Sequence, residues 1–279
     1  MRARRLLSSA CLLLAVSHSA LAQTAGPFSL TLGVVPQFPA VETQRRWLPV
    51  TESIGRACSV DIRLEFSTDI PEFEGKFLGG KFDLTYVNPY HAVMAHKAQG
   101  YVPLVRDGEK PLKGVLVVHR DSPIKRLSEL SGSTIAFPAP NAFGASLYMR
   151  ALLEREHQVR FSPDYVKTHG NAYRHVVKGE AAAAGGVMAT YLAERTEIRD
   201  QLRVLYETPG AAPHPLMAHP RIDTSVRRCI TEHLTQASPT ISTLTAAIQM
   251  SQPVKADYAR DYQPLEKLAL EKYVVHGAP

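Results

Sequence analysis

Apolar and polar positions along the chain follow two periods, and segments of the two kinds alternate. Val60 to Phe66 alternates strictly, as a half-buried strand does, whereas Val41 to Arg56 repeats its apolar positions at helical spacing. The same patterns predict further strands over 28–35, 82–87, 114–118, 133–137, 164–168, 183–187 and 202–206. Further helices are predicted over 70–79, 89–99, 122–130, 171–178, 225–236, 238–250 and 253–260, and after residue 141. This alternation indicates βαβ units and a largely parallel sheet.

Two polar, turn-rich segments interrupt the alternation, near 106–113 and 207–218. They separate a middle βα block from an N-terminal βα block and from a group of C-terminal helices. We therefore expect an α/β fold of two lobes joined by two hinge crossovers, with the C-terminal helices packed on the first lobe. The expected boundaries are 23–107 plus 218–279 for the first lobe and 108–217 for the second.

Residues 1–22 have the three parts of a secretory signal peptide. Three arginines precede an apolar core, Leu6 to Val16, that is too short to span a bilayer, and small residues precede Gln23. Removing this segment lowers the formal charge from +6 to +3. The mature chain is thus expected to be exported, and it lacks the clustered basic residues that nucleic-acid binding requires.

The mature chain keeps two cysteines, Cys58 and Cys229. In an oxidising compartment such a pair favours one disulfide, with two buried free thiols as the alternative. His91 and His96 are five residues apart and do not share a helical face, so no metal site is expected there. We expect neither a metal nor a cofactor. His175, His214 and His219 are expected on the surface or in loops.

The stretch 136–150 carries the strongest indication of a ligand site. A short apolar strand leads through two prolines into a helix with Asn141 as the candidate N-cap. Its first turn carries the small residues Ala142, Gly144 and Ala145, which leave the main-chain N–H groups uncovered. Those N–H groups have no partner within a helix and lie at the positive end of its dipole, so they predict an anion site.

In two-lobed folds of this kind, ligands bind beyond the carboxyl ends of the strands. Gln37 follows the first predicted strand, and Asn88 and Tyr90 follow the third. The alternative for Asn88 is that it only caps the helix that begins at Pro89. These strand ends therefore supply further candidates for ligand contact.

Several short motifs occur in order over residues 30–220, and no single one is specific. They are Leu32–Gln37, Gly80–Tyr86, Val117–Phe137, Pro140–Gly144, His169 and Lys178–Val187. Together they resemble the phosphate/phosphite/phosphonate substrate-binding family of ABC transporters, a branch of the type 2 periplasmic binding fold. The resemblance implies a monomeric periplasmic protein that captures a small anionic ligand, a tetrahedral oxyanion, between its lobes and delivers it to an inner-membrane ABC permease.

The resemblance also implies which residues face the ligand. Tyr86 matches a family tyrosine after the third strand, His169 matches a histidine of the second lobe, and Asn141 and Gly144 match the helix start. The full set of candidate ligand-binding residues is Gln37, Tyr86, Asn88, Tyr90, Asn141, Ala142, Phe143, Gly144, Ala145, Ser146 and His169.

The chain departs from the family pattern at three positions. Ala142 and Phe143 stand where hydroxyl residues are usual, and Ser146 would supply a hydroxyl from the next turn. Met188 stands where an acid often binds the amino group of aminoalkylphosphonates. A site with fewer hydroxyl donors must depend on main-chain N–H groups, Tyr, Asn and His.

Two other function classes compete with transport. A sensory protein of the same fold would present its ligand to a membrane histidine kinase instead of a permease. A secreted hydrolase is less well supported, because Gly144 and Ser146 do not form a Gly-x-Ser-x-Gly elbow and no His-Glu-x-x-His motif occurs. We therefore expect a binding protein and not an enzyme.

Overall fold

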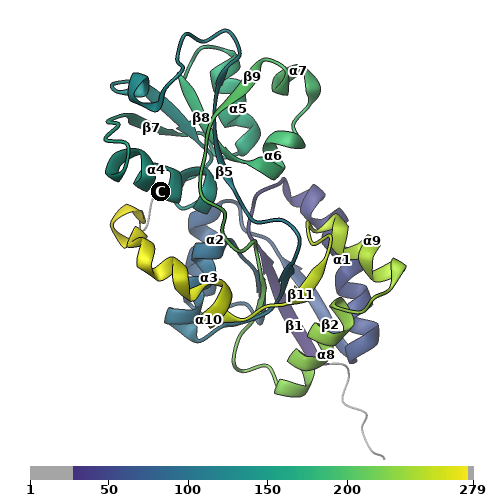
Figure 1. Cartoon of the computed structure of the whole chain (residues 1–279). Helices are drawn as coiled ribbons and strands as arrows, with labels where there is room; N and C mark the ends of the chain where they lie inside the picture. The colour runs from purple at the N-terminus through teal and green to yellow at the C-terminus, as the bar shows by residue number, and fades with distance from the viewer. Residues whose placement is uncertain (1–27, 276–279) are drawn as a thin grey trace, which may run out of the picture.

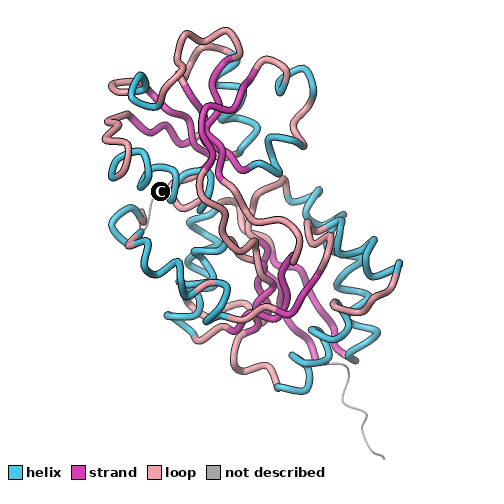
Figure 2. Tube along the Cα trace, viewed as in Figure 1, coloured by secondary structure: helices cyan, strands magenta, loops and turns pink. Residues whose placement is uncertain are grey.

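A computed structural model describes residues 28–275, so the predicted signal peptide lies outside the described residues. Two mixed sheets, each flanked by helices, form two lobes joined by extended crossovers (Figure 1). Figure 2 shows the long loops that pass between them. The predicted α/β fold with two lobes and two crossovers is confirmed.

The first lobe contains a six-stranded sheet in the order β11-β4-β10-β3-β1-β2. Its strands are β1 (Phe28–Val34), β2 (Val60–Glu65), β3 (Leu84–Tyr86), β4 (Val102–Asp107), β10 (Leu216–Ala218) and β11 (Pro253–Lys255). β1 pairs in parallel with β2 and β3, whereas β10 pairs antiparallel with β3 and β4. The carboxyl ends of β1 and β3 therefore lie side by side at one edge of this lobe.

The second lobe contains a five-stranded sheet in the order β7-β6-β8-β5-β9. Its strands are β5 (Gly114–His119), β6 (Thr134–Phe137), β7 (Ser162–Tyr165), β8 (Ala183–Val187) and β9 (Leu202–Glu207). β6 pairs in parallel with β7 and β8, and β5 runs antiparallel to β8 and β9. The crossovers β4–β5 and β9–β10 connect the two sheets.

Helices cover both sheets. In the first lobe they are α1 (Ala40–Cys58), α2 (Ile70–Leu78), α3 (Pro89–Gln99), α8 (Thr224–Leu234), α9 (Pro239–Ala247), α10 (Tyr258–Asp261) and the turn η3 (Gln263–Leu268). In the second they are η1 (Leu127–Leu130), η2 (Phe143–Leu147), α4 (Tyr148–Arg155), α5 (His169–Val177), α6 (Met188–Leu192) and α7 (Thr196–Arg199). The last turn is η4 (Leu270–Tyr273).

The spacing of apolar residues in α1 explains how this helix packs on the first-lobe sheet. Trp47, Val50 and Ile54 recur at helical spacing, and all three are buried in the core of the first lobe. The Trp47 ring lies 5.0 Å from that of Tyr86 on β3, which fixes the helix over the sheet. The pattern of buried positions thus determines which face of α1 packs on the first-lobe sheet.

Several predicted elements differ from the structure. Only Leu127–Leu130 of the predicted helix 122–130 is helical, as a short 3₁₀ turn, and Pro253–Lys255 pairs with β4 as a strand before α10 begins. β4 and β10 were not predicted, and each adjoins a hinge segment. Both take part in antiparallel pairs of the first lobe, and β5 pairs antiparallel with β8 and β9 in the second, so the sheets are mixed and not largely parallel.

The C-terminal helices pack mainly on the first lobe, as predicted. α8 and α9 contact α1, and η3 contacts α3. The last turn is an exception, because η4 contacts α4 of the second lobe. Arg155 donates to the carbonyl of Leu268 at 2.8 Å, and Arg150 donates to that of Tyr273 at 2.7 Å. The end of the chain therefore bridges the two lobes.

Cys58 and Cys229 form a disulfide that ties the end of α1 to α8, across 171 residues of sequence. This bond lies within the first lobe. Within residues 28–275, no helix has the length and apolar character needed to cross a membrane.

Candidate functional site

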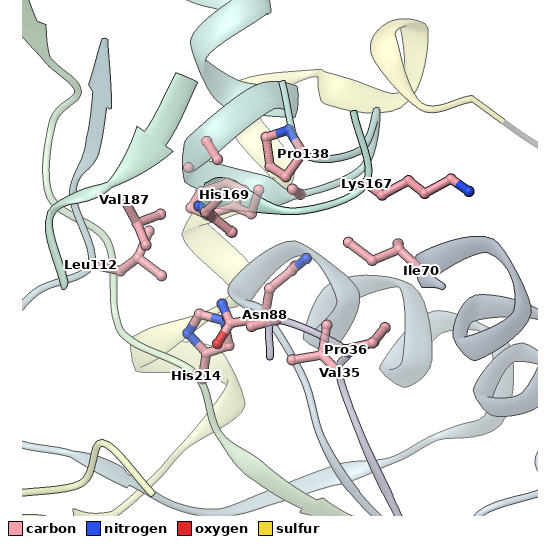
Figure 3. A pocket seen from close by; sticks show the side chains of 15 residues that line it. Val35, Pro36, Ile70, Asn88, Leu112, Pro138, Lys167, His169, Val187 and His214 are labelled. Carbon is pink, nitrogen blue, oxygen red and sulfur yellow. The ribbon is translucent and has the colours of Figure 1, made fainter. Parts of the chain in front are cut away.

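The two lobes meet at a small cavity beyond the carboxyl ends of β1, β3 and β6, which we call the cleft cavity (Figure 3). It holds about 400 Å³ of empty space, part of it open to solvent. Its lining residues are Val35, Pro36, Gln37, Ile70, Asn88, Leu112, Pro138, Ala142, Phe143, Gly144, Ala145, Lys167, His169, Val187 and His214. Seven of the eleven candidate residues are in this set, so the structure brings most of the predicted site together.

The second-lobe side of the cavity is the start of a helix. η2 opens as a π-helical turn after Ala142, whose carbonyl accepts from both Ser146 and Leu147, and α4 continues it. Within the described residues, the main-chain N–H groups of Phe143, Gly144 and Ala145 donate no hydrogen bond. These N–H groups lie at the positive end of the helix and suit an anion.

Asn141 does not cap this helix, contrary to the sequence prediction. The cap position is Ala142, which supplies no side-chain hydrogen bond. The Asn141 amide instead donates to Glu74 of α2 and to the carbonyl of Val275, both at 2.9 Å, and accepts from the Val275 N–H at 3.0 Å. Its side chain therefore holds the lobes together, and the N–H groups of the helix stay uncapped.

Asn88 has two roles in the structure. Its carbonyl oxygen accepts from the His91 N–H at 2.8 Å and so caps α3, which was the alternative left open by the sequence. Its amide nitrogen donates to the main-chain oxygen of Asn141 at 3.1 Å across the lobes. Figure 3 shows that this side chain also reaches the cleft cavity.

His169 begins α5 and faces the cavity from the second lobe. Thr168 caps the helix, and His169 Nδ1 lies 3.1 Å from the Thr190 hydroxyl, which fixes the ring. The residue is 7 % exposed, and burial lowers the pKa of its imidazole to about 4. The ring is therefore neutral at pH 7, with Nε2 as the ring nitrogen that Thr190 does not contact.

His214 was expected on the surface or in a loop, and the structure places it in a loop that is buried and lines the cavity. Its Nε2 lies 2.9 Å from Nε2 of Gln37, and its ring stacks on Tyr86 at 5.5 Å. Burial, with smaller effects of His91 and His169, lowers the pKa of His214 to about 3. The sequence signal for this residue was its place in the second hinge segment, between Pro213 and Pro215.

Four candidate residues do not line the cleft cavity. Tyr86 donates its hydroxyl to the Ile248 carbonyl at 3.2 Å, and Tyr90 stacks on Phe143 at 6.5 Å. The Ser146 hydroxyl accepts from Arg150 at 3.2 Å, so it does not replace the missing hydroxyl donors. The fourth is Asn141. These side chains support the walls of the cavity from behind.

Arg150 secures the helix start from its buried side. This residue is 7 % exposed and donates to Ser146, to the Pro140 carbonyl at 2.9 Å and to the tail at Tyr273. Burial lowers the pKa of its guanidinium, and within the described residues it makes no ion pair with a carboxylate. An unpaired buried cation therefore lies behind the candidate anion site, where it favours negative charge.

The chemical character of the cavity follows from the remaining lining residues. No described lining residue carries a hydroxyl, and most are apolar. Lys167, which the sequence analysis did not select, is the only charged one in the described lining, and it extends away from the cavity at its rim in Figure 3. No group of three or more described His, Cys, Asp or Glu side chains is placed to hold a metal. The site therefore suits a small anion with an apolar part.

Comparisons with known proteins agree with this geometry. Residues 32–262 match the family model "ABC transporter, phosphonate, periplasmic substrate-binding protein". A structure of PhnD1 from Prochlorococcus marinus in complex with methylphosphonate is similar at a TM-score of 0.79, with 14% identity, covering 89% of this chain and 100% of that one. A binding protein component of an ABC phosphonate transporter from Pseudomonas aeruginosa has a TM-score of 0.75 and 14% identity, covering 87% and 86%.

A third structure, from Xanthomonas citri and bound to ATP, has a TM-score of 0.74 and 16% identity, covering 88% of this chain and 99% of that one. At these identities the structures establish the fold, and the family model covers most of the chain. The chain belongs to the family of periplasmic substrate-binding proteins of phosphonate ABC transporters.

Proposed function

We propose that this protein binds a phosphonate, or a closely related tetrahedral oxyanion, in the cleft cavity and delivers it to an inner-membrane ABC permease. One observation carries the proposal. The unused N–H groups of Phe143, Gly144 and Ala145 lie in the same cavity as His169 and the first-lobe residue Gln37. The complex of PhnD1 with methylphosphonate, in a protein of the same fold, supports this ligand class.

The roles of the residues follow from their chemistry. The helix-start N–H groups receive the phosphonate oxygens, and charge-assisted hydrogen bonds of this kind are about twice as strong as neutral ones. His169 offers the anion Nε2, the ring nitrogen that Thr190 does not contact, as one further hydrogen-bonding group. Lys167 at the rim attracts the anion during approach. Val35 and Leu112 contact the carbon substituent of a small phosphonate.

Closure of the lobes would sequester the ligand. We propose lobe boundaries at 23–107 plus 218–279 and at 108–217, with the hinge in the β4–β5 and β9–β10 crossovers. Contacts such as Asn88 to Asn141 then form only when the lobes meet. We further propose that residues 1–22 direct export to the periplasm and are removed there, and that the protein acts as a monomer.

The proposal is tested by binding of simple anions to the mature protein. A thermal-shift and calorimetric series with methylphosphonate, phosphite, phosphate and sulfate should show stabilisation by methylphosphonate that rises with the logarithm of its excess over the Kd. His169→Ala should weaken binding about tenfold, the loss of one hydrogen bond to a charged group, whereas His119→Ala, on the second lobe away from the cavity, should not.

Two results would overturn the proposal. One is the absence of any shift with all of the anions tested. The other is equal affinity of the parent and the His169→Ala variant. Delivery is tested separately, by asking whether ligand-loaded protein stimulates ATP hydrolysis by its permease in vesicles; stimulation of a membrane histidine kinase instead would identify a sensory protein.

A further inference from the structure

A second cavity adjoins the cleft cavity on the side of the hinge, and we call it the hinge chamber. It holds about 880 Å³ of empty space, part of it open to solvent, and is lined by residues of both crossovers and of the loop after α9. Four residues line both spaces, namely Gln37, Leu112, Val187 and His214. The two cavities are therefore neighbours across a wall only one side chain thick.

This wall has two distinct halves. Leu112 and Val187 lie together on one side of the cleft cavity in Figure 3 and are apolar. Gln37 and His214 form the other half and are both uncharged at pH 7, because burial lowers the pKa of His214 to about 3. A short methylene chain can pass between apolar side chains and neutral polar groups without an unpaired charge. The carbon substituent of a phosphonate bound in the cleft cavity would therefore meet no charged group where it passes these side chains.

The charged residues that line the hinge chamber indicate which chemical group the end of that substituent carries. Two lysines, Lys110 and Lys113, line it. Lys113 already pairs with Glu207 at 3.1 Å, whereas Lys110 makes no ion pair within residues 28–275. Lys110 therefore supplies the unpaired cation of the chamber.

The one carboxylate in the described lining is already engaged. Asp107 is 4 % exposed, and its two oxygens accept the main-chain N–H groups of Lys110 and Gln252 at 2.9 and 2.8 Å. These bonds hold the first crossover to the loop before β11. Met188 and Ala189, at the start of α6, also line the chamber and carry no charge. An ammonium group would find the exposed Lys110 and only the buried, hydrogen-bonded Asp107, while a carboxylate would find a cation.

From these observations we infer that the preferred ligand is a phosphonate with a short carbon chain that ends in a second acidic group, such as a carboxylate. The phosphonate occupies the cleft cavity, the chain passes the wall formed by Gln37, Leu112, Val187 and His214, and the carboxylate lies in the hinge chamber near Lys110. This inference rests on the proposed function, and its test separates the two.

Four probes, three of them similar in size, distinguish the possibilities by calorimetry on the mature protein. They are methylphosphonate, propylphosphonate, 2-carboxyethylphosphonate and 2-aminoethylphosphonate. We expect 2-carboxyethylphosphonate to bind about tenfold more tightly than propylphosphonate and 2-aminoethylphosphonate to bind most weakly of the three longer compounds. The advantage should shrink at high ionic strength, because Lys110 is exposed.

Three variants place the effect in the chamber. Lys110→Met should remove the advantage of 2-carboxyethylphosphonate over propylphosphonate and leave methylphosphonate binding unchanged. Lys125→Met, at an exposed position on the second lobe, is the matched control and should leave all four affinities unchanged. Met188→Glu adds a carboxylate to the chamber and should reverse the preference in favour of 2-aminoethylphosphonate.

The outcomes separate the inference about the hinge chamber from the proposed function. If methylphosphonate binds but the longer compounds bind more weakly, or if propyl and carboxyethyl compounds bind equally, the inference about the hinge chamber is wrong and the proposed function stands. If Lys110→Met does not change the order of affinities, the assignment of Lys110 is wrong. If no phosphonate binds but phosphate or phosphite does, only the inference is wrong, and if none of these anions binds, the inference and the proposed function are both wrong.

Discussion

The two histidines of the cleft cavity are uncharged, although the proposed ligands are anions. His169 and His214 are buried beside the cavity, and burial lowers the pKa of each imidazole to about 4 and about 3. A neutral imidazole adds hydrogen-bonding capacity to the cavity without adding a charge. The positive potential instead comes from the helix start, from Arg150 behind it and from Lys167 at the rim.

The pH dependence of stability follows from the same burial. The pKa of His169 is about 4 in the folded protein and near 6.5 when unfolded, so between these values the unfolded chain binds more protons. Stability is therefore lost as the pH falls from about 6.5 towards 4. We expect His169 to account for about 2 kcal/mol of that loss between pH 7 and pH 5.

Urea unfolding of the ligand-free parent and of the His169→Gln variant, each at both pH values, measures how much His169 contributes to the loss of stability. The variant should lose about 2 kcal/mol less than the parent over that interval. His119→Gln removes an imidazole from the partly exposed end of β5 and is the control. An equal pH dependence in parent and His169→Gln would contradict the assignment.

At the scale of elements, the helix start depends on close approach to glycines of the neighbouring strands. A Cβ at Gly114 of β5 would overlap the carbonyl of Gly144, and one at Gly185 of β8 would overlap that of Ala145. The N–H groups of η2 are thus positioned by two strands that leave room only for glycine. This packing is what connects the second sheet to the anion site.

Gly114→Ala should therefore push the helix start out of place. We expect a loss of about 1–3 kcal/mol in the free energy of unfolding, as overpacking of a core usually costs, together with at least tenfold weaker methylphosphonate binding. Gly75→Ala in α2 is the matched control, because no heavy atom lies within 4 Å of its added Cβ. It should stabilise the helix by up to about 1 kcal/mol and leave binding unchanged. Normal binding by a folded Gly114→Ala variant would refute this account.

At the scale of the whole molecule, the interactions that join the two lobes differ from the disulfide that stabilises the first lobe. A buried polar chain from His91 through Glu74 to Asn141 crosses between them, with distances of 2.8 and 2.9 Å. The C-terminal tail adds the bonds from Asn141 to Val275 and from Arg150 to Tyr273. The disulfide between Cys58 and Cys229 lies apart from these contacts, within the first lobe.

Removing the disulfide should therefore affect stability and not ligand affinity. A double Cys58→Ser, Cys229→Ser variant should lose about 2–5 kcal/mol in the free energy of unfolding, because the bond closes a long loop in the unfolded chain. Neither cysteine lines the cleft cavity, so the Kd for methylphosphonate should stay within about twofold of the parent. Thermal unfolding with and without ligand measures both quantities, and an affinity loss above tenfold would show that this bond also shapes the cleft.

The sequence by itself determined the features that depend on local pattern. Period-2 and period-3.6 segments predicted most strands and helices, two polar segments marked the crossovers, and small residues at 142, 144 and 145 marked the helix start. The order of short motifs indicated the family. Each of these signals lies within one stretch of chain, where backbone geometry and burial leave a direct imprint on residue choice.

Only the tertiary structure decided which side chains line the cleft cavity. His214 pairs with Gln37 across 177 residues of sequence, and Asn141 meets Glu74 and Val275 across 67 and 134. The Tyr86 hydroxyl donates to the main-chain carbonyl of Ile248, 162 residues away. Hydrogen bonds of this range depend on how two lobes and a C-terminal tail come together, and no periodicity within a single element encodes them.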